Sequence, residues 1–275
     1  MILSAFTFAV MNMIIRHVHH FPVLQLVFFR SVGSSLLGCF FIYRANISFL
    51  GTHRKLLLLR SFFGVTSMSL FYTAIQMMPV GTAVSLRYLS PVFATIFAIF
   101  LLREKVKPIQ WLFFICAFIG VSLIKGFDPR ISFLGLVVIM GAAVLSALVY
   151  TTIRMIGQRE NHLVIVNYFM VISTLVGAVG CLFKWDSPVG IEWVYLCSLG
   201  ILGFLAQIWM TKSLQAAETN LITPVKYSEA IFTVLGGWLV FGEGQNILAL
   251  AGILLVICSL VANVIVKRSY SQESK

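Results

Sequence analysis

Residues 64–93 read GVTSMSLFYTAIQMMPVGTAVSLRYLSPVF, and residues 203–232 read GFLAQIWMTKSLQAAETNLITPVKYSEAIF. Aligned at an offset of 139 positions, the two stretches share few identical residues. They do share a pattern, because each contains a basic residue followed directly by a tyrosine, Tyr88 in the first and Tyr227 in the second. This pattern predicts an internal repeat that covers most of the chain.

The composition predicts the environment of this repeat. Of the 275 residues, 60% are hydrophobic and 11% are charged, whereas an average soluble domain is about 45–50% apolar and about 25% charged. We therefore expect an all-α, polytopic integral membrane protein. A helix needs about 20 apolar residues to span a bilayer, and division at charges and turn residues predicts ten spans: 1–16, 22–43, 56–77, 81–102, 108–125, 132–153, 163–183, 191–212, 220–241 and 246–266.

The ten spans predict two inverted five-helix repeats. Five is an odd number of crossings, so the second repeat must enter the membrane from the opposite side. Inverted repeats are typical of secondary transporters, whose substrate site lies near the midplane between the repeats. We expect the repeats at 1–126 and 131–268 and a cytoplasmic tail at 269–275. The first span is short, which favours a truncated or misassigned start over a signal peptide, since no basic segment precedes it.

The basic residues predict the orientation in the membrane. With a cytoplasmic N-terminus, cytoplasmic segments hold thirteen of the twenty Lys and Arg residues and outer segments hold four, namely Arg16, Lys125, Arg130 and Lys184. Cytoplasmic loops of membrane proteins carry such an excess. We therefore expect both termini to be cytoplasmic and the protein to lie in an inner (plasma) membrane. The net charge of +11 thus reflects orientation and not a nucleic-acid partner.

Two cations occupy matching positions in the repeats. Arg87 lies six residues from the outer end of its span and Lys226 six residues from the inner end of its own, which is about 9 Å in each case. A charge inside the hydrocarbon core costs about 2.5–3.5 kcal/mol or more. We expect both to face a central site and to bind an anionic group of a substrate. The alternatives are pairing with an internal carboxylate or extension to the headgroups.

Glu229 lies three residues after Lys226, so both can project from one helical face. We expect Glu229 near the midplane, as a substrate contact and as the site of a coupling proton. A static ion pair with Lys226 is the alternative.

Aromatic and amide side chains complete the predicted site. Tyr72, Tyr88, Tyr150, Tyr227 and Trp209 can stack on a planar ligand, although aromatic residues in membrane helices also serve in packing. Asn12 is a further candidate contact, with interhelical hydrogen bonding as the alternative.

Two other arginines fall in predicted spans. For Arg30, near the middle of its span, a site role and a structural role remain equally open. Arg60 lies one turn inside the cytoplasmic end, and we expect it to extend to the headgroups. Glu104 and Glu243 end their spans at matching positions, and we expect a capping or ion-pair role for Glu104. Pro91 removes a backbone donor and can kink its helix.

The chain resembles the EamA-type branch of the drug/metabolite transporter superfamily. The resemblance rests on AFTFAVMN at 5–12, FFRS at 28–31, FYTAIQMMPVGTAVSLRYLSPVFATIFAIFLLREKV at 71–106, GVSLI at 120–124 and SLQAAETNLITPVKYSEAIFTVLGGWLVFGE at 213–243. It implies a ten-helix carrier of small metabolites with cytoplasmic termini. The second half departs from the pattern, because Glu229 and Ala230 stand where the first half has Ser90 and Pro91.

These observations predict a secondary transporter that moves an anionic or zwitterionic metabolite, such as an amino acid derivative or a nucleotide-like compound, by alternating access. The alternative is a multidrug or toxic-metabolite exporter of the same fold; a membrane-embedded enzyme and a scaffold are less favoured. We expect no enzymatic activity, cofactor or metal, since no Walker loop, zinc pair or Ser-His-Asp arrangement occurs. The expected partners are the substrate, the lipid bilayer and protons as coupling ions, with a monomer or homodimer as the assembly.

Overall fold

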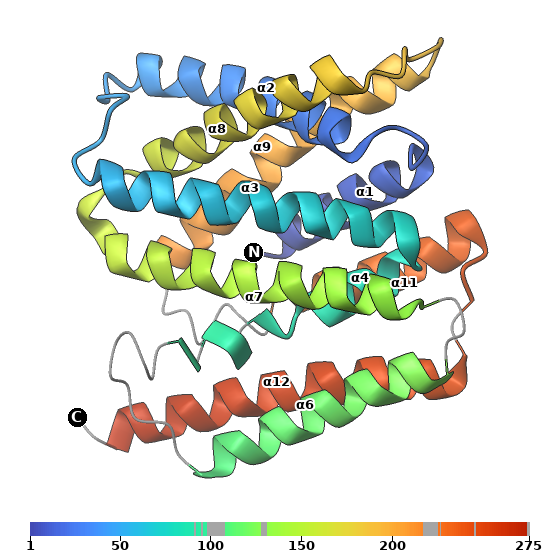
Figure 1. The fold of residues 1–275 in the computed structure, drawn as a ribbon. Helices are drawn as coiled ribbons and strands as arrows, with labels where there is room; N and C mark the ends of the chain where they lie inside the picture. Colours follow the sequence, from blue (N-terminus) through green and yellow to red (C-terminus); the bar gives the residue numbers. More distant parts are fainter. Residues whose placement is uncertain are drawn as a thin grey trace.

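The computed structural model describes residues 1–90, 92–94, 96–97, 108–127, 131–216, 225, 227–244 and 246–273. Within these residues every regular element is a helix (Figure 1). The α-helices are α1 (Ile2–His17), α2 (Val23–Arg44), α3 (Arg54–Met77), α4 (Val80–Arg87), α6 (Pro108–Phe127), α7 (Phe133–Ile156), α8 (His162–Phe183), α9 (Glu192–Ala216), α11 (Ser228–Phe241) and α12 (Ile247–Glu273), with a 3₁₀ turn, η1 (Gly157–Arg159), between α7 and α8.

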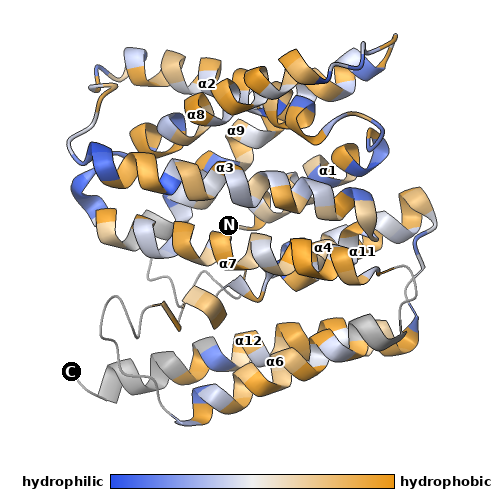
Figure 2. Ribbon diagram, in the orientation of Figure 1, coloured by the Kyte–Doolittle hydropathy of each residue, from blue (hydrophilic) through white to orange (hydrophobic). Residues whose placement is uncertain are grey.

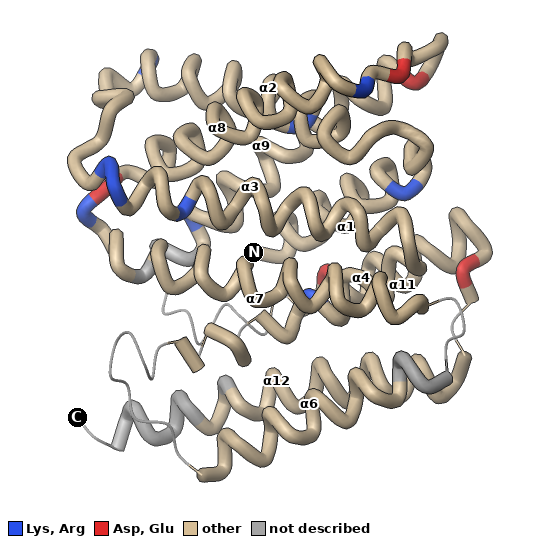
Figure 3. The backbone as a smooth tube through the Cα atoms, viewed as in Figure 1, with Lys and Arg blue, Asp and Glu red and all other residues tan. Residues whose placement is uncertain are grey.

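The helices have the lengths and surfaces of a membrane protein. Five of them (α2, α3, α7, α8 and α9) contain stretches long and apolar enough to cross a bilayer, and α1, α6, α11 and α12 contain shorter apolar stretches. Apolar residues cover the helices along most of their length (Figure 2), and large side chains such as Phe183 are almost fully exposed. Charged residues gather mainly at the helix ends (Figure 3). This confirms the predicted fold class.

The two halves are related by the offset seen in the sequence. Helix α2 and helix α8 both have 22 residues and begin 139 positions apart, and α6 and α12 also begin 139 positions apart. Each of these helices packs against its own repeat counterpart, and the two members of each pair run in opposite directions (Figure 1). The second half is therefore inverted, as predicted.

The α2–α8 contact shows the symmetry at the level of side chains. A Cβ on Gly38 of α2 would lie 2.7 Å from Oδ1 of Asn167 on α8. In the same way, a Cβ on Gly177 of α8 would lie 2.8 Å from the Cα of Phe28 on α2. Gly38 and Gly177 are repeat counterparts, and so are Phe28 and Asn167. Each half therefore contributes one glycine and one larger residue to the crossing.

Helices α2 and α9 come closest where two glycines meet. A Cβ on Gly33 would lie 2.8 Å from the Cα of Gly200, so no side chain separates the backbones at this point. Ser34, the neighbour of Gly33, donates a hydrogen bond of 2.8 Å from its Oγ to the carbonyl oxygen of Gly200. Small residues commonly permit such close approach in membranes.

The predicted span 81–102 is not one continuous helix, which corrects the prediction. Helix α4 ends at Arg87, and Tyr88 and Leu89 form a turn before further helical residues follow. The sequence explains the break, because Pro91 has no amide hydrogen to continue the helical pattern. In the second half, α11 begins only at Ser228, after Tyr227. Most of 220–226, including Lys226, lies outside the described residues.

Candidate functional site

The end of α4 and the start of α11 meet inside the protein. Tyr88 follows the end of α4 and Tyr227 precedes the start of α11. Their rings pack edge to face, with centroids 5.0 Å apart and planes at 83°, and both side chains are buried. The two tyrosines predicted as repeat counterparts are therefore in direct contact.

A buried carboxylate lies beside this contact. Glu229, in the first turn of α11, has no exposed surface. Its Oε1 accepts a hydrogen bond of 3.1 Å from Nδ2 of Asn12 on α1, and its Oε2 accepts one of 2.9 Å from the hydroxyl of Tyr88. We call Asn12, Tyr88 and Glu229 the Glu229 network. The structure thus brings together three residues that the sequence analysis singled out.

The partners of Glu229 are neutral. No ion pair within the described part of the chain includes this carboxylate. The predicted partner Lys226 lies outside the described residues, so the static pair with Glu229 stays a prediction. Asn12 retains one buried oxygen, Oδ1, without a hydrogen-bond partner.

Arg87, the residue before Tyr88, contacts helix α3. Its guanidinium carbon lies 3.9 Å from the centre of the Phe71 ring, a cation–π contact, and its charge acts on both Tyr88 and Tyr72. The side chain is half-buried. No carboxylate within the described residues pairs with it. Arg87 is therefore near the Glu229 network without being bonded to its acid.

Arg30 on α2 reaches the middle of α3. It is 5% exposed, its Nη1 donates to the sulfur of Met68, and its guanidinium carbon lies 5.9 Å from the centre of the Tyr72 ring. The Tyr72 hydroxyl is buried next to Arg30. Among the described residues, no group has the distance and angle of a hydrogen bond to it. These contacts place Arg30 in the interior, and both the site role and the structural role stay predictions.

Arg60 is buried, and the prediction that it extends to the headgroups is wrong. Only 3% of it is exposed, and its guanidinium carbon lies 4.1 Å from the centre of the Phe169 ring of α8. Its Nη1 reaches Gly64, one turn deeper in α3, where a Cβ would lie 3.2 Å from that nitrogen. The aromatic face and the missing side chain at Gly64 hold the guanidinium inside the bundle.

The two remaining predicted residues differ in their placement. Tyr150, half-buried on α7, interacts electrostatically with Tyr88, Tyr227 and Arg60, which places it at the centre. Trp209 is half-buried on α9, and within the described residues no hydrogen bond or ring contact links it to the others.

A second carboxylate forms a contact that the sequence analysis missed. Glu243 lies just after α11. Its Oε1 accepts a hydrogen bond of 2.7 Å from Nε of Arg16, and its Oε2 accepts one of 3.0 Å from the backbone amide of Val80. Arg16 also donates a hydrogen bond of 3.0 Å from Nη1 to the carbonyl oxygen of Ile75. We call Arg16, Glu243 and the Val80 amide the Glu243 clamp. It joins the end of α1, the start of α4 and the end of α11. The matching positions of Glu104 and Glu243 gave a signal for it; Glu104 lies outside the described residues.

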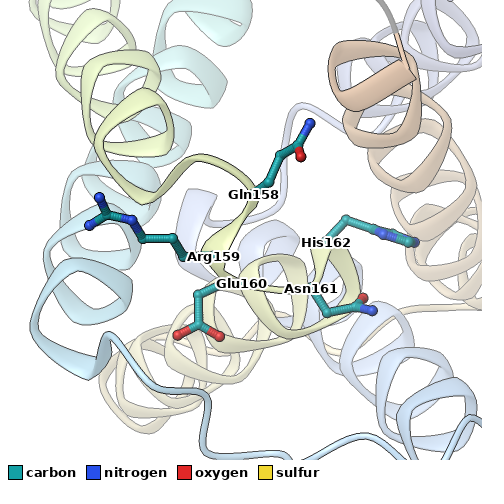
Figure 4. A pocket seen from close by; sticks show the side chains of 5 residues that line it. All are labelled: Gln158, Arg159, Glu160, Asn161 and His162. Carbon is teal, nitrogen blue, oxygen red and sulfur yellow. The ribbon is translucent and has the colours of Figure 1, made fainter.

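The hollow at the η1 turn is formed by a single segment, Gln158, Arg159, Glu160, Asn161 and His162 (Figure 4). Burial raises the pKa of the Glu160 carboxyl, but hydrogen bonds from Thr52 Oγ1 and the amides of His53 and Thr52 outweigh it, so the pKa lies below its ordinary value. These bonds tie the α7–α8 connection to the start of α3.

Comparison with known proteins agrees with this architecture. The sequence matches the EamA-like transporter family over residues 1–126 and again over residues 133–265. The chain belongs to the EamA-like transporter family. It is therefore a multi-pass membrane transporter and not an enzyme, as predicted.

Two relatives and one solved structure are similar over nearly the whole chain. The pseudopaline exporter CntI of Pseudomonas aeruginosa is 26% identical over 95% of this chain and 93% of its own. Human solute carrier family 35 member G1 is 29% identical over 100% of this chain and 80% of its own. A crystal structure with 19% identity superposes with a TM-score of 0.69, covering 97% of this chain and 95% of that one, and shows the fold alone.

Proposed function

We propose that this transporter is a secondary carrier that moves a small anionic or zwitterionic metabolite by alternating access, with Glu229 as the site of a coupling proton. The observation that carries the proposal is the contact of Tyr88, at the end of α4, with Tyr227, at the start of α11, beside the buried Glu229. Interrupted helices at the repeat interface form the substrate and ion sites of many secondary transporters. The similarity to a pseudopaline exporter supports a small organic substrate.

The Glu229 network is suited to protonation and deprotonation of the Glu229 carboxylate. In the observed arrangement both carboxylate oxygens accept hydrogen bonds, which suits the ionised form. A protonated carboxyl needs an acceptor for its own hydrogen. A tyrosine hydroxyl can donate or accept, and an amide offers an oxygen as well as its nitrogen. Asn12 Oδ1 is buried and without a partner, so the network can satisfy both protonation states.

The charge of the interior favours the anionic substrate class. Arg30 and Arg60 are buried and Arg87 is half-buried, whereas a drug exporter selective for cations needs an acidic interior. The excess of basic residues on one side supports cytoplasmic termini in an inner membrane. A monomer or homodimer suffices for this mechanism, because both halves of the site come from one chain.

Transport in proteoliposomes tests the proposal. Labelled amino acids, dicarboxylates and nucleotides are offered with and without an imposed pH gradient. We expect at least one to be carried, and Glu229→Gln to remove the response to the gradient, because its amide cannot exchange a proton. Glu192→Gln, at the start of α9, is the control and keeps the response. Gradient-driven transport that survives Glu229→Gln contradicts the coupling role, and transport of none of these classes contradicts the proposed carrier.

A further inference from the structure

Two buried arginines and a tyrosine present hydrogen-bond donors that have no acceptor among the described residues. Four buried groups have no hydrogen-bond partner in the part of the chain that the structure describes: Arg30 Nε, Arg60 Nε, Arg60 Nη1 and the Tyr72 hydroxyl. We call Arg30, Arg60 and Tyr72 the arginine cluster. Buried polar groups are normally paired, and leaving a charged donor unpaired is more costly than leaving a neutral one. These donors therefore call for an acceptor.

The cluster follows one face of α3. Arg60, Gly64, Met68 and Tyr72 are spaced four residues apart and so lie in one row. Arg60 reaches Gly64, and Arg30 reaches Met68 and Tyr72. Gly64 and Met68 are one turn apart, about 6 Å along the axis. The charges of Arg30 and Arg60 act on each other, so each makes the burial of the other more costly.

The bundle leaves room for both guanidinium groups and covers the face of one. Repeat-related glycines border them: a Cβ on Gly64 would lie 3.2 Å from Arg60 Nη1, and a Cβ on Gly203 would lie 3.1 Å from Arg30 Nε. Phe169 covers the flat face of Arg60. A ring on that face leaves the in-plane N–H groups available, which is the geometry that binds a carboxylate or phosphate through two hydrogen bonds.

No acid among the described residues occupies this place. The carboxylates whose partners the structure shows bind elsewhere, Glu229 to Asn12 and Tyr88 and Glu243 to Arg16. We infer that the arginine cluster is an anion site that binds the carboxylate or phosphate group of the transported substrate. This rests on the proposed carrier function, and it assigns the anionic group to α2 and α3 in the first repeat, whereas the sequence predicted binding by Arg87 and Lys226.

Anion binding by the full-length protein in phosphatidylcholine nanodiscs tests the inference without transport. Inorganic phosphate and citrate are titrated against sodium chloride of equal ionic strength, and the thermal unfolding midpoint gives an apparent dissociation constant. We expect one or both anions to raise the midpoint of the wild type. Arg30→Gln and Arg60→Gln weaken that binding about tenfold or more, as expected for lost charged hydrogen bonds. Arg44→Gln and Arg54→Gln, at exposed positions of the same helices, retain wild-type binding.

Tyr72→Phe keeps the test decisive if an arginine variant fails to fold. It removes only a hydroxyl that has no hydrogen-bond partner among the described residues. If Tyr72 has a purely structural role, the variant keeps wild-type anion binding, and its unfolding midpoint is unchanged or higher. If Tyr72 belongs to the anion site, as we expect, the unfolding midpoint measured without anion is unchanged or higher, and anion binding is weakened severalfold. Wild-type anion binding in both Arg60→Gln and Tyr72→Phe overturns the inference, as does the absence of binding by the wild type.

Two further arms separate the possible outcomes. If phosphatidylglycerol in the disc abolishes the Arg60-dependent rise of the unfolding midpoint by phosphate or citrate, the site holds a lipid headgroup and the substrate assignment is overturned. Transport that is unaffected by Arg60→Gln overturns the inference while the carrier function stands. Arg60-dependent binding of phosphate or citrate without transport of any offered metabolite supports the anion site and contradicts the carrier function.

Discussion

Two carboxylates at opposite ends of α11 have opposite surroundings. Glu229 at its start is fully buried and is bonded to an amide and a phenol, both neutral. Glu243 just after its end is bonded to the guanidinium of Arg16 and to the first amide of α4. Among the described residues, the charge of Glu243 is therefore balanced by a cation, whereas the partners of Glu229 are neutral. One carboxylate suits a structural contact and the other suits a change of protonation.

The largest stability difference is expected when each acid is replaced by its amide. Glu243→Gln removes the charged partner of Arg16 and should cost about 2 kcal/mol, which lowers the unfolding midpoint by several degrees. Glu229→Gln keeps the shape and adds no unpaired charge, so its cost should stay below about 1 kcal/mol. Thermal unfolding in one detergent measures both. Equal losses at the two positions would show that Glu229 is also a structural charge.

Double-mutant cycles sharpen the same comparison. Arg16→Gln combined with Glu243→Gln should give a coupling energy of about 1–2 kcal/mol, since the two side chains are bonded and mostly buried. The cycle of Tyr88→Phe with Glu229→Gln should give a smaller coupling energy, because only one member of this hydrogen bond carries a charge. Unfolding midpoints of the single and double variants supply both energies. The reverse order would contradict the assigned charge balance.

Tyr88→Phe probes the Glu229 network with a smaller change. The ring remains and keeps its contact with Tyr227, but Oε2 of Glu229 loses its donor. We expect a stability loss of about 1 kcal/mol and severalfold slower gradient-driven uptake in proteoliposomes. Tyr43→Phe, on the exposed end of α2, should change neither quantity. Unaltered uptake in Tyr88→Phe would mean that the hydroxyl has no part in the coupling.

Replacement of Glu160 should give the smallest change in stability, and the direction of its pH dependence can be checked. Its pKa is lower in the folded protein than the ordinary value of 4.5, so its bonds stabilise the fold above pH 4.5. That contribution is lost as the pH falls from 4.5 through the lowered pKa. Glu160→Gln should therefore destabilise the protein slightly at neutral pH and flatten the decline in acid. Midpoints measured between pH 3 and 7 test this, and identical pH profiles would contradict it.

Much of the fold could be predicted because it depends on local and repeated signals. Apolar stretches of membrane length predicted the helices, and an odd number of them per repeat predicted the inversion. The break at Tyr88 was harder, since Pro91 indicated a kink without showing that α4 ends at Arg87. The paired glycines Gly38 and Gly177 contribute to tertiary contacts whose partners no local pattern identifies.

The site was predicted less completely because its contacts join distant parts of the chain. Asn12 and Glu229 are 217 residues apart, and Tyr88 and Glu229 are 141 apart. The sequence identified these polar residues as unusual without showing which would meet. For Arg60, distance to the membrane surface suggested an exposed charge. The aromatic ring that instead covers it belongs to Phe169, on a helix of the other half.

The crossing of α2 and α9 at Gly33 and Gly200 has a mechanical consequence. These helices belong to different halves, and at this point their backbones touch. In a rigid rotation, displacement grows with distance from the pivot. If the halves turn about this crossing, the backbone there moves least, and residues farther from it move more. Contacts that join the halves away from this crossing, such as the Arg16–Glu243 ion pair, would then bear more of the displacement than the two glycines.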